Sequence, residues 1–191
     1  MSRAWREWLD RALEANPERP DALYLQLATV RPGGRPANRT IFFRGFLEPG
    51  PRLVFTTNAH SAKVAELAAQ PWAEACWHFR TTREQFRIAG RVETVGARHP
   101  DAALRAERLR LWALQREDSR LTFAWPRPGL PRAGDPAFAV PAPDPALPAE
   151  NFLLGLLAPD EVDYIDLRPA LHERWRFARE AGGWRAERLN P

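Results

Sequence analysis

Two stretches decide the fold of this chain: Arg39-Thr40-Ile41-Phe42-Phe43-Arg44 and Val54-Phe55-Thr56-Thr57-Asn58-Ala59-His60-Ser61-Ala62-Lys63. Each contains a strand-like apolar run. The second ends in hydroxyl groups, an amide and a lysine, just where helix-forming residues begin. Hydroxyls, a cation and the free backbone amides of a first helical turn are the donors that a phosphate ester requires. We therefore predict a phosphate-binding corner between a strand and a helix.

The composition is typical of a globular protein. Of 191 residues, 45% are hydrophobic and 27% are charged, so we expect one domain spanning residues 1–191. Cys76 is the only cysteine, which excludes an intrachain disulfide framework and favours a cytoplasmic location. The first 16 residues are charged throughout, and no apolar run is long enough to span a bilayer. We expect neither secretion nor membrane insertion.

The net charge of +4 and the isoelectric point near 10.1 raise the question of nucleic-acid binding. The basic residues, however, are spread along the chain, are mixed with 24 acidic residues, and form no consecutive block. This pattern favours a solvated mixed surface with a few local anion sites over a polyanion groove. All the basic residues are arginines except Lys63, which falls in the predicted corner.

Hydrophobic periodicity and turn residues predict short strands with a few helices. Helical patterns cover residues 2–16, 62–70 and 101–116, with Ser2, Ser61 and Asp101 at their starts. The expected strands are residues 23–28, 36–46, 52–57, 73–80, 84–94, 151–157, 162–167, 173–179 and 184–189. Short, mostly antiparallel strands indicate a mainly β fold: a closed or partly closed barrel flanked by helices.

The stretch from Pro126 to Pro148 contains eight prolines and shows no sustained periodicity. Proline prevents regular helix and central strand, so we expect an irregular loop. Such a long irregular segment inside one domain is more often a functional flap or a mobile excursion than a linker.

In the predicted corner, Arg39, Thr57, Ser61 and Lys63 supply the cations and directed donors that a phosphate needs. Strand alternation places Arg39 and Arg44 on opposite faces unless a bulge intervenes, so one is expected to serve the phosphate and the other a neighbouring group or substrate. Spacing alone leaves a second interpretation open, because Thr-Thr-Asn before a serine-capped helix is also ordinary turn chemistry.

Several motifs occur in order along the chain: residues 39–45, 54–58, 61–63, 85–90 and 171–174, and the ending Glu187-Arg188-Leu189-Asn190-Pro191. Together they resemble the pyridoxamine 5'-phosphate oxidase-like FMN-binding split-barrel superfamily. The N-terminal tryptophan helix and the proline-rich loop are similar to its Alr4036-type subgroup. The resemblance implies an antiparallel split β-barrel, FMN as cofactor, and a homodimer with the cofactor at the subunit interface.

The family pattern, applied residue by residue, implies a cofactor site and a substrate side. Arg39 and Lys63 would contact the FMN phosphate, with hydroxyl bonds from Thr57 and Ser61. Gln85 would touch the isoalloxazine ring, and Arg174 would reach the flavin. The implied cofactor-binding set is Arg39, Thr40, Arg44, Thr56, Thr57, Ser61, Lys63, Gln85 and Arg174, and the substrate-side residues are His172 and Arg116.

The chain also departs from that pattern. Ala62 replaces a basic residue, Tyr164 stands near the position of a flavin-contacting tryptophan, Thr56 replaces an aromatic residue, and Arg127-Pro128 replaces a Gln-Ser pair. These departures imply a lower FMN affinity. On the substrate side, Ala170 replaces an arginine, and the helical clamp of the oxidases aligns only with Trp112, Arg116 and either Ser119 or Arg120. Pyridoxine 5'-phosphate is therefore not the substrate that we expect.

Other chemistries have weaker support. The four histidines lack metal-ligand spacing, and the three serines lie in no nucleophile motif, so we expect no metal site and no hydrolase triad. We expect an FMN-dependent oxidoreductase that acts on a small molecule, in which the flavin carries the redox chemistry and no protein acid–base pair is indispensable. The alternatives are a non-catalytic flavin carrier and a barrel without cofactor.

Overall fold

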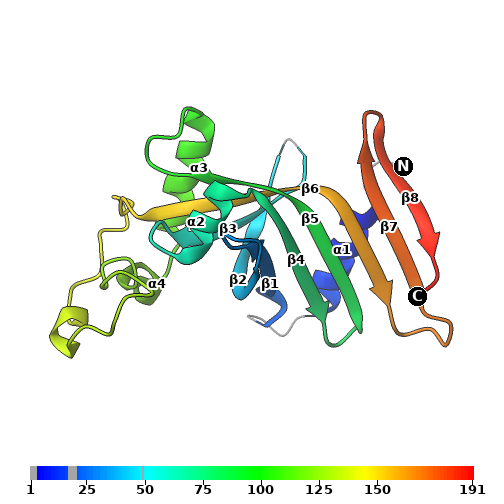
Figure 1. Ribbon diagram of the computed structural model, residues 1–191, viewed down its shortest axis with the longest axis horizontal. Helices are drawn as coiled ribbons and strands as arrows, with labels where there is room; N and C mark the ends of the chain where they lie inside the picture. Colours follow the sequence, from blue (N-terminus) through cyan, green and yellow to red (C-terminus); the bar gives the residue numbers. More distant parts are fainter. Residues whose placement is uncertain (1–3, 17–20, 49) are drawn as a thin grey trace.

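The computed structural model describes residues 4–16, 21–48 and 50–191. The chain alternates short helices with antiparallel strands, and Figure 1 shows it as an elongated molecule. The helices are α1 (Ala4–Ala15), α2 (Ala62–Ala69), α3 (Ala102–Ala113) and α4 (Glu117–Leu121). The strands are β1 (Tyr24–Val30), β2 (Pro36–Leu47), β3 (Arg52–Asn58), β4 (Trp72–Phe79), β5 (Glu84–Val95), β6 (Phe152–Asp166), β7 (Glu173–Glu180) and β8 (Gly183–Leu189).

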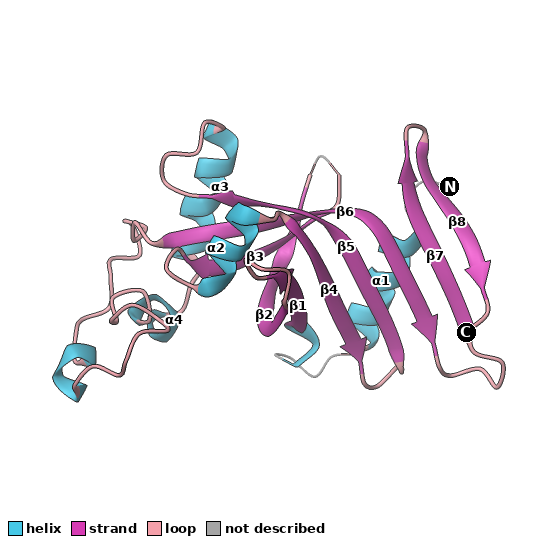
Figure 2. Cartoon of the chain, viewed as in Figure 1, coloured by secondary structure: helices cyan, strands magenta, loops and turns pink. Residues whose placement is uncertain are grey.

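All eight strands belong to one antiparallel sheet in the order β3-β2-β1-β4-β5-β6-β7-β8. The additional pairing of β3 with β6 closes the first six strands into a barrel and leaves the β7–β8 hairpin as an extension (Figure 2). Closure pairs the edges of the six-stranded part, whereas β8, which pairs only with β7 among the described strands, remains an edge strand. The predicted antiparallel barrel with flanking helices is thus confirmed.

The strand β6 makes both the barrel and its extension possible. Its first half pairs with β3 from Asn58↔Phe152 to Leu53↔Leu157, and its second half pairs with β7. The sequence pattern predicted two separate strands here, residues 151–157 and 162–167. That prediction was wrong: Pro159 lies where the β5–β6 register shifts, and a bulge tolerates a residue without an N–H.

Two glycines allow close contact where the barrel closes. A Cβ atom on Gly90 would lie 2.0 Å from the carbonyl oxygen of Ala158, beside the bulge. A Cβ atom on Gly155 would lie 2.1 Å from the ring of Phe55 across the β3–β6 pair. Any larger side chain at either position forces the strands apart.

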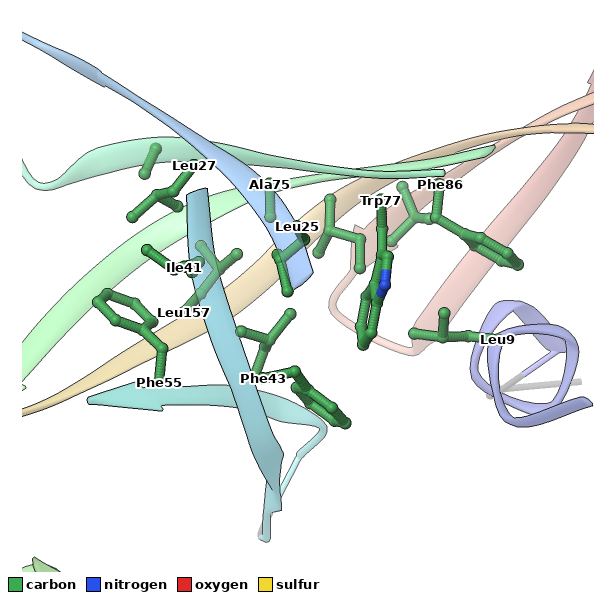
Figure 3. Packing of buried hydrophobic residues seen from close by; sticks show 14 of the residues in the cluster. Leu9, Leu25, Leu27, Ile41, Phe43, Phe55, Ala75, Trp77, Phe86 and Leu157 are labelled. Atoms are coloured by element: carbon green, nitrogen blue, oxygen red, sulfur yellow. The ribbon is translucent and has the colours of Figure 1, made fainter. Parts of the chain in front are cut away.

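The core of the barrel follows the predicted alternation. Leu25 and Leu27 of β1 are fully buried, whereas Tyr24, the first residue of this strand, is exposed. This is the alternation of buried and exposed residues that the sequence predicted. Both leucines belong to the main core cluster, in which Figure 3 shows Leu27 beside Ile41 and Leu9 of α1 reaching toward Trp77. The expected helix start at Ser2 and the stop at Pro17 lie outside the described residues.

A second apolar cluster anchors the proline-rich segment. Asp101 caps α3 as predicted, but this helix ends at Ala113 instead of near Arg116, and α4 follows. Trp112 packs against Phe123 and Phe152, and its indole donates to the carbonyl oxygen of Asp144 at 2.8 Å. The segment 126–148 is irregular as predicted, apart from one 3-10 turn at Asp135–Phe138. It extends beyond α4 at one end of the molecule (Figure 1), and its Pro143 and Asp144 carbonyl oxygens accept hydrogen bonds from Arg120 and Trp112.

Among the helices that the structure describes, none combines the length and the apolar character needed to cross a membrane.

Candidate functional site

The predicted corner opens into a pocket of about 940 Å³. The outer face of β2, the end of β3, the start of α2 and the segment after α3 surround it, and its size is in the range of small-molecule and cofactor sites. Its lining includes six of the predicted site residues. These are Thr40, Arg44, Thr56, Thr57, Ser61 and Lys63.

Three polar side chains meet in one corner of this pocket. The Lys63 ammonium donates to the Thr57 hydroxyl at 3.1 Å and to the Ser61 hydroxyl at 3.2 Å, and the two hydroxyl groups lie 3.1 Å apart. Ser61 occupies the N-cap position of α2, but its side chain makes no capping hydrogen bond. The hydroxyl that the sequence assigned to the helix end faces Lys63 and Thr57 instead, beside the free amides of the first turn.

The electrostatics of the pocket favour an anion. Four cationic residues line it, and no aspartate or glutamate occurs among its described lining residues. Burial and the neighbouring Arg39 hold the pKa of Lys63 below its ordinary value of 10.5, against the opposing effect of Glu66. A lysine in such surroundings gains from a bound anion, because the negative charge restores the stability of the ammonium form. The four cations are Arg44, Lys63, Arg127 and Arg132.

Arg39 lies behind the corner and does not line the pocket. Its guanidinium donates to Glu66 on α2 at 2.5 Å, to the Thr29 hydroxyl and to the carbonyl oxygen of Leu27. Glu66 is 6% exposed, and although burial opposes it, hydrogen bonds from Thr29 and Arg39 keep the pKa of Glu66 below its ordinary value. We overlooked Glu66, which is the only acidic residue between Ser61 and Gln70.

Arg44, unlike Arg39, lines the pocket. It lies at a register shift in the β2–β3 ladder, next to Gly45 with φ of 121°. Its guanidinium donates to the Gln115 side chain at 2.7 Å and lies 4.4 Å from the centre of the Phe42 ring. Burial lowers the pKa of Arg44, and its Nε atom is buried without a hydrogen-bond partner. This group is a donor still available to an anion.

Gln85, Arg174 and His172 do not line the pocket of their own chain. Gln85 and Arg174 both pair with Ile165 across the sheet, so the two side chains share its outer face. Arg174 donates to Asp163 at 2.8 Å, and His172 lies in a separate hollow with the C-terminal residues. In Figure 1 the β7–β8 hairpin and the α4 region lie at opposite ends of the molecule.

The residues aligned with the oxidase clamp are dispersed. Trp112 is fully buried in the second core cluster, and Arg116 is 84% exposed and paired with Asp118. Arg120 donates to the carbonyl oxygens of Gln115 and Pro143 and thereby fastens the segment 126–148. Of the aligned positions, only Ser119 lines the pocket.

Tyr164, which stands near the expected flavin-contacting tryptophan, is also in the core. Its hydroxyl donates to Glu84 at 2.7 Å, and burial together with this carboxylate raises the pKa of Tyr164. Among the described residues, no group of three or more His, Cys, Asp and Glu side chains is placed to hold a metal ion.

Comparison with known proteins gives consistent results. Residues 2–96 match the model of the pyridoxamine 5'-phosphate oxidase FMN-binding domain. The chain is 38% identical to pyridoxine/pyridoxamine 5'-phosphate oxidase 2 of Arabidopsis thaliana, covering 98% of this chain and 96% of that protein. It is 33% identical to the pyridoxine/pyridoxamine 5'-phosphate oxidase of Gluconobacter oxydans, covering 96% and 90%. A pyridoxamine 5'-phosphate oxidase-related, FMN-binding protein of Nostoc punctiforme has a similar crystal structure, with 44% identity, a TM-score of 0.93 and 98% of each chain covered.

Proposed function

Because this chain belongs to the pyridoxamine 5'-phosphate oxidase-like family of FMN-binding barrels, its cofactor is FMN, and we propose that it is an FMN-dependent oxidoreductase acting on a small molecule. One observation carries the proposal. The pocket places Lys63, Thr57 and Ser61 together at the start of α2 with no acidic side chain among its described lining.

The residues present fit this cofactor. A phosphate monoester has a charge of about −1.5 to −2 at neutral pH and strong acceptor oxygens, and the corner offers an ammonium, two hydroxyls and backbone amides. The remaining pocket is wider and includes the aromatic side chains of Tyr24 and Phe42, which suit a planar ring. Bound FMN supplies the redox chemistry through its ring system.

The side chains divide the remaining tasks. Lys63, Thr57 and Ser61 bind the phosphate end. Arg44, whose buried Nε lacks a partner, holds a second negative charge, either on the cofactor or on the substrate. The segment 126–148 lines one side of the pocket through residues 126–133 and Phe138.

We further propose a homodimer in which each pocket is completed by the partner chain. Gln85 and Arg174 share the outer face of the sheet with Thr40 and Phe42, because the antiparallel pairs connect these residues strand by strand through β1 and β4. Neither residue lines the pocket of its own chain. A two-fold axis through this face would bring the Arg174 and Gln85 of one subunit to the pocket of the other.

Subunit mixing tests this arrangement. Co-expression of Lys63→Met and Arg174→Ala chains with different affinity tags yields heterodimers in which one pocket carries both substitutions and the other carries neither. The expected result is one tight FMN site per heterodimer, measured by flavin titration, while each mutant homodimer binds weakly. If heterodimers bind no better than the homodimers, Arg174 does not serve the partner's pocket.

For the substrate, we propose a small molecule other than pyridoxine 5'-phosphate, although the named relatives are oxidases of that compound. The support is the position of the clamp residues: Trp112 is in the core, Arg116 is turned to solvent, and Ala170 has no charged group. Efficient turnover of pyridoxine 5'-phosphate with oxygen, followed by peroxide release, would contradict this proposal.

The redox role itself is tested in two steps. The purified protein is expected to show the visible absorption bands of bound flavin and to lose them when NAD(P)H or a member of a substrate panel is added under nitrogen. Bound flavin that no donor reduces would instead identify a flavin carrier. Protein that binds no FMN at high flavin concentration would remove the basis of the proposal.

A further inference from the structure

The phosphate corner has fewer free cations than a phosphate dianion requires. Lys63 is its only lysine or arginine between Asn58 and Gln70, and Arg39 is already neutralised by its ion pair with the buried Glu66. The first residue of α2, Ala62, is exposed and contributes only a methyl group. A second uncompensated positive charge would improve the electrostatic balance.

Such a charge reaches the corner from the proline-rich segment. The Arg127 guanidinium donates to Nδ1 of His60 at 3.0 Å, in the tight turn that leads into α2. The turn is fixed locally: the His60 amide donates to the Asn58 side chain at 2.9 Å, and the Ser61 amide donates to the Asn58 carbonyl oxygen at 2.9 Å. Arg127 lines the same pocket as Lys63.

Arg127 differs from the other arginine of this segment. Arg132 is paired with Asp135 at 2.7 Å and lies over the Phe138 ring at 4.1 Å. Arg127, by contrast, contacts a histidine and forms no ion pair with an acidic residue of the described chain. Its charge is therefore available to a bound anion, while that of Arg132 is compensated.

We propose that Arg127 is the second cationic ligand of the FMN phosphate, supplied from the segment 126–148 to the side of the corner where Ala62 leaves room. The inference rests on the FMN site described above. His60 is the positioning residue that holds the guanidinium over the turn. In this arrangement the proline-rich segment contacts the phosphate end of the cofactor and also lines the pocket.

The test compares FMN with riboflavin, which has the same ring but no phosphate. Arg127→Ala is expected to weaken FMN binding about tenfold, the scale of one charge-assisted hydrogen bond at a partly solvated site, and to leave riboflavin binding unchanged. Flavin fluorescence quenching gives both dissociation constants. The matched control is Arg132→Ala, for which the ratio of the two constants is expected to remain that of the wild type.

A second variant keeps the test decisive. Ala62→Arg, introduced into Arg127→Ala, places a guanidinium next to Lys63 from the helix side and is expected to restore most of the FMN affinity. Equal weakening of FMN and riboflavin, or unchanged FMN binding, would overturn the role of Arg127, as would a failure of Ala62→Arg to improve FMN binding. Wild-type protein that binds neither flavin would instead contradict the proposed function, and melting curves of all variants check their folding.

Discussion

Two arginine-rich regions of this molecule look alike in sequence and differ in how their charges are paired. On the outer face of β4 to β8, Arg87 pairs with Glu74, Arg174 with Asp163, and Arg176 with Glu187. In the pocket, Lys63 and Arg127 form no ion pair among the described residues, and the described lining has no acidic side chain.

This difference indicates where an anionic ligand binds. A cation with an acidic partner has little to gain from a phosphate, because binding must first break the existing pair or share it. A cation whose burial has lowered its pKa gains directly when a negative charge arrives. The net charge of +4 gives no such information, because it sums paired and unpaired residues alike.

The largest effect is expected from a substitution that removes the charge of the unpaired Lys63. Lys63→Met retains the length of the side chain and removes its charge, so the dissociation constant of FMN is expected to rise about a hundredfold while that of riboflavin is unchanged. Titration with both flavins measures the two values. An FMN affinity near that of the wild type would show that the corner is ordinary helix-start structure.

Arg39 lies behind the phosphate corner, but it is paired with an acidic residue, Glu66, as the arginines of the outer face are. Glu66→Gln leaves the partly buried Arg39 guanidinium without this counter-ion, and we expect the free energy of unfolding to fall by about 2 kcal/mol, measured by urea denaturation. Glutamine can still hydrogen-bond to Arg39, so the expected decrease in the free energy of unfolding is smaller than the full cost of leaving a charge unpaired.

The pH dependence of the Glu66 variant sharpens the same point. The pKa of Glu66 in the folded protein lies below its ordinary value of 4.5, so its contribution to stability is complete above about pH 4.5 and is lost as the pH falls through the folded pKa. The stability difference between wild type and Glu66→Gln should therefore shrink below about pH 4.5. A difference independent of pH would show that the carboxylate charge is not what holds Arg39.

A smaller effect is expected on the paired outer face. Arg174→Ala should weaken FMN binding about tenfold through the partner's pocket, while losing the half-exposed pair with Asp163 costs at most about 1 kcal/mol of stability. The matched control is Arg176→Ala on the same strand and face, which should leave FMN binding unchanged. Equal behaviour of the two variants in flavin titration would mean that neither arginine reaches a flavin.

The smallest effect is in the pH profile of FMN binding. Because the pKa of Lys63 lies below its ordinary value of 10.5 in the free protein, the FMN affinity should begin to fall at a lower pH than an ordinary lysine would allow. The Lys63→Arg variant remains charged, so its loss of FMN affinity at alkaline pH should be severalfold smaller. A wild-type profile that stays flat up to pH 10.5 would contradict the lowered pKa.

Much of the fold was predictable because it depends on local pattern. The alternation in β1, the Asp101 cap of α3 and the break at the prolines of residues 126–148 are each encoded within a few residues. The continuity of β6 through Pro159 was not, because it depends on a bulge opposite Gly90 in another strand. The extra helix α4 after Ala113 was missed for a similar reason, since Trp112 and Arg120 are fixed by the distant segment 143–144.

The candidate site divides in the same way. The sequence by itself indicated an antiparallel barrel, closed or partly closed, and the corner of Thr57, Ser61 and Lys63, because strand alternation and a strand-to-helix turn are encoded by neighbouring residues. The closure itself depends on the pairing of β3 with β6, which are distant in the chain. Only the tertiary structure decided which cations are free. Whether Arg39 meets Glu66, or Arg127 meets His60, depends on which side chains the closed sheet brings together from distant parts of the chain. Coulomb interactions act over a few ångströms in space, and sequence separation does not fix those distances.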